Sequence, residues 1–290
     1  METATQHRGL DREAVESYWK DGYLFPLSGL SEKEARAARM ELEALEREWL
    51  DNGLPLPLNT YKRVNAHVVI PMVARLSRTP AILDAVEGIL GPDILIYAAE
   101  LFIKEARTKQ IVTMHQDLTY WGLGAIDGMV TAWLALSPAS PESGCMDFVK
   151  GSHKNPILPH EDTFDANNLL SRGQEVKVDV APEDRVPIVL QPGEFSLHHG
   201  LTIHGSGPNV SDDRRIGVVV RYIRPDMKQE TGMRDFVMAA RGEDRFRNFE
   251  HLPAPESNFS VESLAIYDEI RAEQTKILMR DAKGSSSVYG

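Results

Sequence analysis

The chain has 290 residues, of which 42% are hydrophobic, and its formal net charge is −11 at pH 7. A chain of this length buries roughly three quarters of its unfolded surface, so its core needs no disulfides, and the single cysteine, Cys145, is expected to be a small buried hydrophobe. The acidic balance, without a long lysine or arginine run, argues against nucleic acid and a membrane surface as partners. Residues 1–8 lack an apolar signal region, and no stretch approaches the ~20 apolar residues that span a bilayer, so we expect a cytoplasmic protein.

The first part of the chain, residues 1–92, is predicted to be mainly helical. Ser31 and Glu34 have the spacing of a capping box, which predicts that a helix begins there. A second helix is predicted to begin at Pro80, because proline favours the first helical position, and to end at Gly91-Pro92. These helices should flank the sheet that follows.

Residues 93–223 consist of short, apolar, β-branched segments separated by turns. The predicted strands are Ile94–Lys104, Gln110–Asp117, Met129–Ser137, Met146–Val149, Val186–Leu190, Phe195–His199 and Ile216–Ile223. Since no long helical pattern separates these segments, they predict an antiparallel sandwich or barrel rather than a parallel sheet. The expected fold class is therefore mainly β with flanking α-helices, around a jelly-roll core.

The remaining segments complete a single catalytic domain over residues 1–290. Residues 153–185 are rich in polar residues and weakly periodic, which makes this interval a candidate lid. The segment 224–290 should contain one further helix, Val261–Asp281.

A cluster of possible metal ligands begins in the predicted strand that ends at Asp117. Residues i and i+2 of a strand point to the same face, so His115 and Asp117 can present an imidazole and a carboxylate to one ion. A second histidine from a distant strand would complete the two-histidine, one-carboxylate triad, which binds Fe(II) and leaves one face of the ion open. His204 is the candidate, with His198 and His199 as rivals that the spacing alone does not exclude.

Two further features weigh on this hypothesis. The triplet His160-Glu161-Asp162 has the same spacing, but it follows Pro159 and precedes a polar run, so we interpret it as a solvated loop. Arg215 opens an apolar strand, and a guanidinium buried there would need an anion such as a carboxylate. That anion could belong to a cosubstrate; alternatively, Arg215 forms a structural salt bridge or lies on a solvated turn with Arg214.

Taken in order, these segments resemble the phytanoyl-CoA dioxygenase family over roughly residues 93–223. The resemblance is carried by His115–Tyr120, Thr131–Leu136, Gly144–Met146 with Lys150–His153, and Ile203–Asn209 followed by Arg215. Such enzymes are Fe(II)- and 2-oxoglutarate-dependent oxygenases with a double-stranded β-helix core, which is a cupin-like jelly-roll. Their reaction releases succinate and CO2 from 2-oxoglutarate as dioxygen is consumed.

The resemblance implies a role for each matching position. His115, Asp117 and His204 match the iron ligands. Arg215 matches the residue that pairs with the distal carboxylate of 2-oxoglutarate, and Ser206 matches a hydroxyl donor to the same group. Trp133 matches a wall of the cosubstrate site, unless it is an ordinary core tryptophan, and Lys104 either faces the cosubstrate or extends to water. Related halogenases have a small residue at the carboxylate position, so Asp117 favours hydroxylation over halogenation.

The substrate is expected to be a small polar metabolite, although desaturation or cyclisation would use the same site. Residues that could line the mouth of the site are Tyr120, Trp121, Lys62, Arg63, Asn65 and His67. Aromatic side chains there would suit an ammonium group, whereas Lys62 and Arg63 would suit a carboxylate or phosphonate; a polar surface loop is the other interpretation of this stretch. The chain also resembles bacterial members of the family that hydroxylate aminophosphonate-type compounds.

Two other functions remain open at this stage. One is a jelly-roll metalloenzyme that does not use 2-oxoglutarate, in which His198 or His199 would bind the metal. The other is a non-catalytic jelly-roll that only binds a ligand. Arg215 separates the first of these from the oxygenase, because only a cosubstrate-dependent enzyme needs it.

Overall fold

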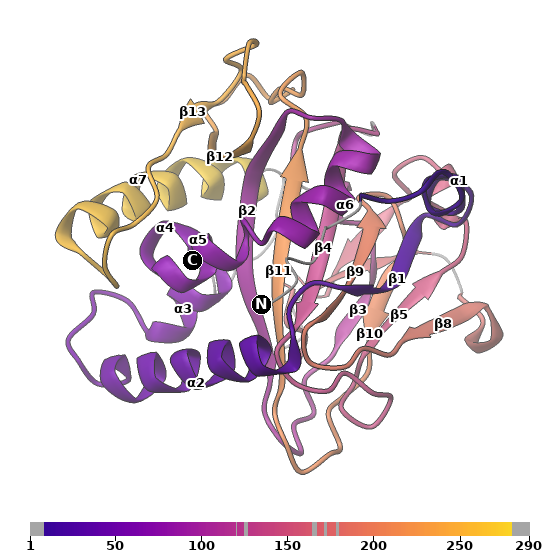
Figure 1. Cartoon of the computed structure of the whole chain (residues 1–290), viewed down its shortest axis with the longest axis horizontal. Coiled ribbons are helices and arrows are strands. Elements are labelled where there is room, and N and C mark those ends of the chain that lie inside the picture. The colour runs from indigo at the N-terminus through magenta and orange to yellow at the C-terminus, as the bar shows by residue number, and fades with distance from the viewer. Residues whose placement is uncertain are drawn as a thin grey trace, which may run out of the picture.

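Two antiparallel sheets face each other at the centre of the molecule, and helices cover the outer side of the larger sheet (Figure 1). The computed structural model describes residues 9–119, 121–124, 127–163, 167–170, 173–177 and 180–279. Apolar side chains of both the larger sheet and the covering helices belong to one hydrophobic core. The molecule is therefore mainly β with flanking helices, as predicted.

The larger sheet has seven strands in the order β1-β9-β4-β11-β2-β12-β13. Their bounds are β1 Tyr23–Ser28, β9 Glu194–His199, β4 Met129–Ala135, β11 Arg215–Ile223, β2 Ile94–Lys104, β12 Phe236–Arg241 and β13 Glu250–His251. All neighbours are antiparallel except β12 and β13. Strands β4 and β11 lie at its centre and are buried along their whole length, which explains their nearly continuous apolar sequences.

The smaller sheet has four strands in the order β3-β10-β5-β8. Their bounds are β3 Val112–His115, β10 His204–Ser206, β5 Met146–Val149 and β8 Arg185–Ile188. A separate two-stranded hairpin joins β6, His160–Asp162, to β7, Gln174–Val176. The antiparallel register of the smaller sheet pairs His204 of β10 directly with His115 of β3.

The helices pack against the larger sheet, with α3, α4 and α5 contacting β2 and α6 contacting β4. Their bounds are α1 Arg12–Asp21, α2 Glu32–Trp49, α3 Leu58–Arg63, α4 Ala66–Val69, α5 Pro71–Leu76, α6 Pro80–Leu90 and α7 Val261–Leu278. The predicted helix starts at the Ser31 cap, Pro80 and Val261 are confirmed. In the described part of the chain, no helix is both long and apolar enough to cross a bilayer.

The strand predictions are confirmed within one or two residues at most ends, but the extent of the sheets was predicted too narrowly. Strand β1 comes from the segment 1–92 and β12 and β13 from the segment 224–290, so the larger sheet is not confined to residues 93–223. Strand β1 contains Pro26, which a sequence pattern excludes from a central strand, and the structure places it at the sheet edge. Strand β10 has three residues, too few for an alternation pattern to be visible.

The prediction that His160–Asp162 is a solvated loop is wrong. These residues form β6, and His160 is partly buried against the end of β3. Two other described residues of the interval 153–185 lie beside the start of β3: the amide of Ile111 donates to the carbonyl of Asn167, and the Asn168 side chain donates to the Thr113 hydroxyl at 2.6 Å. Whether this interval acts as a lid stays a prediction.

The Ser31 cap supports a test of stability that does not involve the site. The Ser31 hydroxyl accepts from the Glu34 amide at 3.2 Å, and the Glu34 carboxylate accepts from the Ser31 amide at 2.7 Å. Ser31→Ala removes this cap and is expected to lower the free energy of unfolding by about 1 kcal/mol. Denaturant unfolding measures the change, and activity should be unaltered; a loss of activity at unchanged stability would contradict this interpretation of the cap.

Candidate active site

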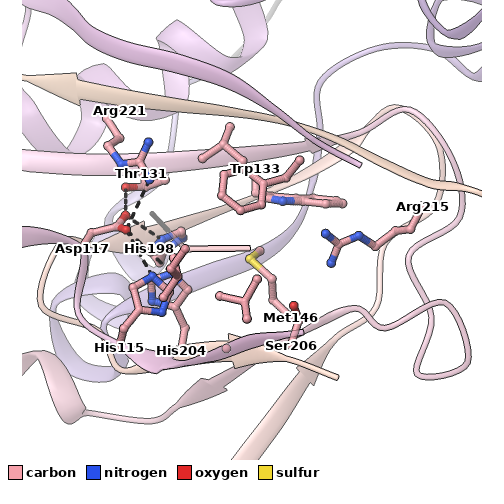
Figure 2. A pocket seen from close by; sticks show the side chains of 15 residues that line it. His115, Asp117, Thr131, Trp133, Met146, His198, His204, Ser206, Arg215 and Arg221 are labelled. Atoms are coloured by element: carbon pink, nitrogen blue, oxygen red, sulfur yellow. Dashed lines mark hydrogen bonds and ion pairs between the residues drawn. The ribbon is translucent and has the colours of Figure 1, made fainter. Parts of the chain in front are cut away.

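Three possible metal ligands from separate segments meet in the space between the two sheets (Figure 2). They are His115 at the end of β3, Asp117 at the start of a short 3₁₀ helix, Asp117–Thr119, and His204 at the start of β10. Their ligand atoms all lie within 4.8 Å of one another, and all three side chains are buried. Asp117 does not continue the strand as predicted, so the 3₁₀ turn rather than strand alternation aims its carboxylate.

Each histidine is oriented by a hydrogen bond to the carbonyl of the residue two positions before it. His115 Nδ1 lies 2.9 Å from the carbonyl oxygen of Thr113, and His204 Nδ1 lies 2.9 Å from that of Thr202. A carbonyl can only accept, so Nδ1 carries the proton and the lone pair of Nε2 faces the other ligands. This is the arrangement in which an outer hydrogen bond fixes the tautomer of a metal-binding histidine. Burial, followed by the neighbouring His115 and His198, lowers the pKa of His204 well below its usual value, which keeps it a neutral ligand.

The two oxygens of Asp117 have different surroundings. Oδ1 lies 3.6 Å from Nε2 of His115 and 4.0 Å from Nε2 of His204, whereas Oδ2 accepts a hydrogen bond from the Thr131 hydroxyl at 2.8 Å. Nε2 of His198 also lies on the Oδ2 side, at 3.5 Å. Oδ1 is therefore the oxygen that faces the metal position. His198, a rival ligand from the sequence, instead supports the carboxylate from behind.

Arg221 gives this carboxylate its charge partner. Its guanidinium donates to Asp117 Oδ1 at 3.4 Å and to Glu100 at 2.9 Å, and all three groups are buried. Burial by itself raises the pKa of Asp117, but Arg221 and the neighbouring histidines outweigh it and hold that pKa well below its usual value. Asp117 is therefore an anion at neutral pH, as a ligand for a divalent cation must be.

The opposite end of the same pocket contains Arg215 (Figure 2). Its side chain is 1% exposed, its guanidinium donates to the Gly144 carbonyl at 2.7 Å, and its Nε has no hydrogen-bond partner. Among the described residues, no carboxylate forms an ion pair with it. Burial lowers the pKa of Arg215 to about 10, so it remains a cation at neutral pH. A buried cation without an anion is costly, and the arrangement fits a ligand carboxylate.

The wall between the two ends of the pocket is apolar. Its members are Phe102, Val112, Trp133, Met146, Leu170 and Val219. The Arg215 guanidinium lies 5.2 Å from the centre of the Trp133 ring, and this indole needs the adjacent Gly217, because a Cβ there would lie 2.1 Å from it. Trp133 thus faces the pocket, and its role as a wall of a cosubstrate site stays a prediction.

Lys104 and Ser206 lie beside Arg215. Lys104 is the register partner of Arg215 on β2, is fully buried, and donates to the Ser206 hydroxyl at 2.6 Å and to the carbonyl of Gly207. The alternative that Lys104 extends to water is therefore wrong. Burial, with Arg215 as the next cause, lowers the pKa of Lys104 to about 6. Ser206 itself lines the pocket.

A comparison with known protein families identifies the family of this chain. The family model described as phytanoyl-CoA dioxygenase matches residues 18–217, more than half of the chain. The chain belongs to the phytanoyl-CoA dioxygenase family. Over 158 residues the chain is 29% identical to the human protein named phytanoyl-CoA dioxygenase, peroxisomal. The aligned residues make up 52% of this chain and 46% of the human protein. The chain thus spans about half the length of this curated relative.

Other proteins are matched over more of their length. A Streptomyces griseoviridis protein named L-proline trans-4-hydroxylase is 26% identical over 73% of this chain and 86% of its own. Among solved structures, a non-heme monooxygenase, ThoJ, is 31% identical, covers 91% of this chain and 97% of its own, and superposes with a TM-score of 0.82. CytC3 with Fe(II) and alpha-ketoglutarate, at 17% identity and a TM-score of 0.65, shows the shared fold alone. The predicted jelly-roll core is confirmed.

Three residues expected at the mouth of the site lie elsewhere. Lys62 is buried and pairs with Glu46 of α2 at 2.6 Å, and Asn65 is buried and donates to Gln274 of α7 at 2.6 Å. His67 is buried in α4, where desolvation lowers its pKa to about 3. The prediction was wrong because the stretch after Pro57 is not a loop: it forms α3 and α4, and both helices pack against β2.

The other expected substrate residues have mixed outcomes. Trp121 is buried behind the pocket, where the Arg221 guanidinium lies 5.0 Å from the centre of its ring, so it does not line the mouth. Arg63 lies 4.3 Å above the ring of Phe102, a pocket residue, and donates to the Leu169 carbonyl, so it is at the rim. Tyr120 lies outside the described residues.

Sequence reasoning missed Thr131, Arg221 and Glu100, although strand alternation could have found two of them. Thr131 is two residues before Trp133 on β4, and Arg221 is six residues after Arg215 on β11, so each shares a face with a residue already assigned to the site. For His198 the sequence left two interpretations, a rival metal ligand or a hydrogen-bonded core residue, and neither assigned it to the support of Asp117. The pairing of His198 with Thr131 across β9 and β4 shows why both face the same carboxylate oxygen.

Proposed function

We propose that this chain is an Fe(II)- and 2-oxoglutarate-dependent dioxygenase that hydroxylates an unactivated C–H bond of a small polar metabolite, with release of succinate and CO2. The observation that carries the proposal is one pocket with two complementary ends. A neutral-histidine and carboxylate triad occupies one end, and a buried arginine that has no acidic partner among the described residues occupies the other. Membership in the phytanoyl-CoA dioxygenase family supports the same conclusion.

The triad fits a ferrous ion by its chemistry. His115 and His204 direct Nε2 lone pairs, and Asp117 directs one anionic oxygen, toward a common point. Two imidazoles and one carboxylate are the donor set of the facial triad, which leaves positions for a chelating cosubstrate and dioxygen. We assign His115, Asp117 and His204 as the iron ligands, held by Thr131, His198 and Arg221.

The other end of the pocket fits the distal carboxylate of 2-oxoglutarate. Arg215 would supply two parallel hydrogen bonds to that carboxylate and so gain the anion it lacks. The Ser206 hydroxyl, which already accepts from Lys104, has its own proton available for the same group. Trp133 forms the apolar wall along which the carbon chain of the cosubstrate would lie.

When bound, Fe(II) and 2-oxoglutarate together supply an oxidant from dioxygen that is strong enough to hydroxylate an unactivated C–H bond. The residues of this chain orient and protect that chemistry. The Arg215 charge and the iron triad fix the two ends of the cosubstrate, and Met146, Val219 and Phe102 keep the space between them apolar. The carboxylate of Asp117 occupies the position that halogenases leave to a halide, so hydroxylation is the proposed outcome.

The proposed substrate is a small compound with an anionic group, and an aminophosphonate-type compound is the first candidate. Arg63 at the rim is positioned to meet such a group beside Phe102. Related proteins are named for small substrates: a Stutzerimonas stutzeri relative, 27% identical over 56% of both chains, is named a probable alpha-ketoglutarate-dependent hypophosphite dioxygenase. The cytoplasmic location also stays a prediction.

The proposal is tested by a succinate-release screen with Fe(II), ascorbate, dioxygen and 2-oxoglutarate against small amines, carboxylates and phosphonates. We expect one group of compounds to raise succinate formation above the substrate-free rate, with a product that gains one oxygen atom. Anaerobic addition of Fe(II) and 2-oxoglutarate should also give a weak visible charge-transfer band. No band and no succinate with any compound would contradict the proposal.

The two other functions predict different results. A metalloenzyme that does not use 2-oxoglutarate would turn over without it and would be indifferent to Arg215. In the structure, His199 points away from the pocket, with Nε2 3.1 Å from Asp127, so a three-histidine site would have to use His198. A non-catalytic binding protein would take up no stoichiometric iron even when Fe(II) is supplied.

A further inference from the structure

A histidine outside the triad repeats the geometry of the two metal-binding histidines. His160 Nδ1 lies 2.7 Å from the carbonyl oxygen of Leu158, two residues before it, as His115 and His204 lie relative to Thr113 and Thr202. Nδ1 of His160 therefore carries the proton, and Nε2 has the lone pair, which can accept a hydrogen bond or bind a metal. In the triad this lone pair faces the metal position. In His160 it accepts a hydrogen bond from the backbone amide of Gln116 at 3.1 Å.

That amide belongs to the residue between two iron ligands. Gln116 directly follows β3, the edge strand of the smaller sheet, and in the described part of the chain its amide has no partner in a sheet ladder. Gln116 is 1% exposed, and an unsatisfied amide at that depth would be costly. His160, reaching across from the β6–β7 hairpin, satisfies it.

The Gln116 side chain joins the same segments. Its amide nitrogen donates to the carbonyls of Pro156 at 3.2 Å and Leu201 at 2.9 Å, and its amide oxygen accepts from the Leu158 backbone at 2.8 Å. Leu201 begins the turn that leads to His204. Gln116 thus connects the His115–Asp117 turn with the segment 156–160 and with the approach to the third ligand.

We propose that His160 is a positioning residue for the iron site: by holding the peptide between His115 and Asp117, it fixes the angle at which these two ligands meet. This inference rests on the proposed iron site, and it gives a role to the His160-Glu161-Asp162 triplet, which does not itself belong to the metal-ligand group of the described residues. Hydrogen bonds made to the ligands themselves typically contribute about 10- to 100-fold to metal affinity, and we expect a bond to the peptide between two ligands to contribute at the lower end of this range.

The test compares His160→Leu with His160→Gln by anaerobic titration of metal-free protein with Co(II), read from its visible absorption, and with Fe(II). Glutamine keeps an acceptor near the position of Nε2, whereas leucine does not. We expect His160→Leu to weaken metal binding by about tenfold or more, and His160→Gln to stay within about threefold of the wild type. Glu161→Gln is the matched control, because Glu161 lies on the same strand with its side chain 65% exposed.

Melting of the metal-free proteins separates positioning from a purely structural role. We expect the leucine variant to melt at a lower temperature than the glutamine variant, because it leaves the Gln116 amide without an acceptor, and both to be folded at the temperature of the titration. The metal affinities are then compared between folded proteins, and His160→Ala replaces the leucine variant if that protein does not fold. Equal metal affinity of His160→Leu and the wild type would overturn the inference, as would an equal loss in both variants. If the wild type itself binds neither metal, the proposed iron site is wrong, and this inference with it.

Discussion

Replacing His204 by alanine is expected to abolish succinate formation and to weaken Fe(II) binding by more than about 100-fold, since even outer hydrogen bonds to such ligands are worth 10- to 100-fold. His204 supplies one of the three ligand atoms and pairs with His115 across β10 and β3. The metal-ligand group of the described residues has no fourth member that could replace it. Anaerobic Fe(II) titration and the succinate assay measure the two effects.

The control for this variant is His251→Ala. His251 is remote from the pocket, partly exposed and paired with Asp244 at 2.8 Å, so its loss should leave metal binding unchanged. If His204→Ala kept its iron, the third ligand would have to be another histidine. His198, 3.5 Å from Asp117, would then be the residue to replace next.

Replacing Arg215 by methionine is expected to raise the KM for 2-oxoglutarate by at least about 30-fold while Fe(II) binding persists. Truncating one partner of a buried, hydrogen-bonded charge pair costs roughly 2–5 kcal/mol, and every 1.4 kcal/mol is tenfold in affinity. Methionine approximates the length of the arginine stem and removes only the charge and donors. Initial rates over a range of 2-oxoglutarate concentrations give the KM, and Co(II) titration reports the metal site.

Thermal melting adds a second readout for Arg215. Without 2-oxoglutarate the guanidinium is buried and meets no carboxylate of the described residues, so the methionine variant should be at least as stable as the wild type. With metal and 2-oxoglutarate the wild type should gain stability and the variant should gain little. Arg214→Gln is the matched control, because this neighbour is outside the pocket and pairs with the partly buried Glu46 and the exposed Glu105. An unchanged KM in Arg215→Met would favour an enzyme that does not use 2-oxoglutarate.

The sequence by itself determined the features that depend on near neighbours in the chain. The Ser31 cap, the helix starting at Pro80, and the β-branched strands such as Ile94–Lys104 follow from spacings of a few residues, and the structure confirms them. The ordered motifs from His115 to Arg215 were also sufficient to indicate the family. Local physics determines these features because capping and strand formation involve groups close in the chain.

Only the tertiary structure decided which groups meet. The choice of His204 over His198 depends on strand register, since pairing across β10 and β3 brings His204 to His115 while β9 turns His198 to the far oxygen of Asp117. The lack of an acid beside Arg215 can be known only once all described neighbours are placed. The same holds for the burial of His67 and for the contact of His160 with Gln116, because these partners are tens of residues apart in the chain. Packing, and not residue type, therefore decides which histidine faces the metal position and which one supports Asp117.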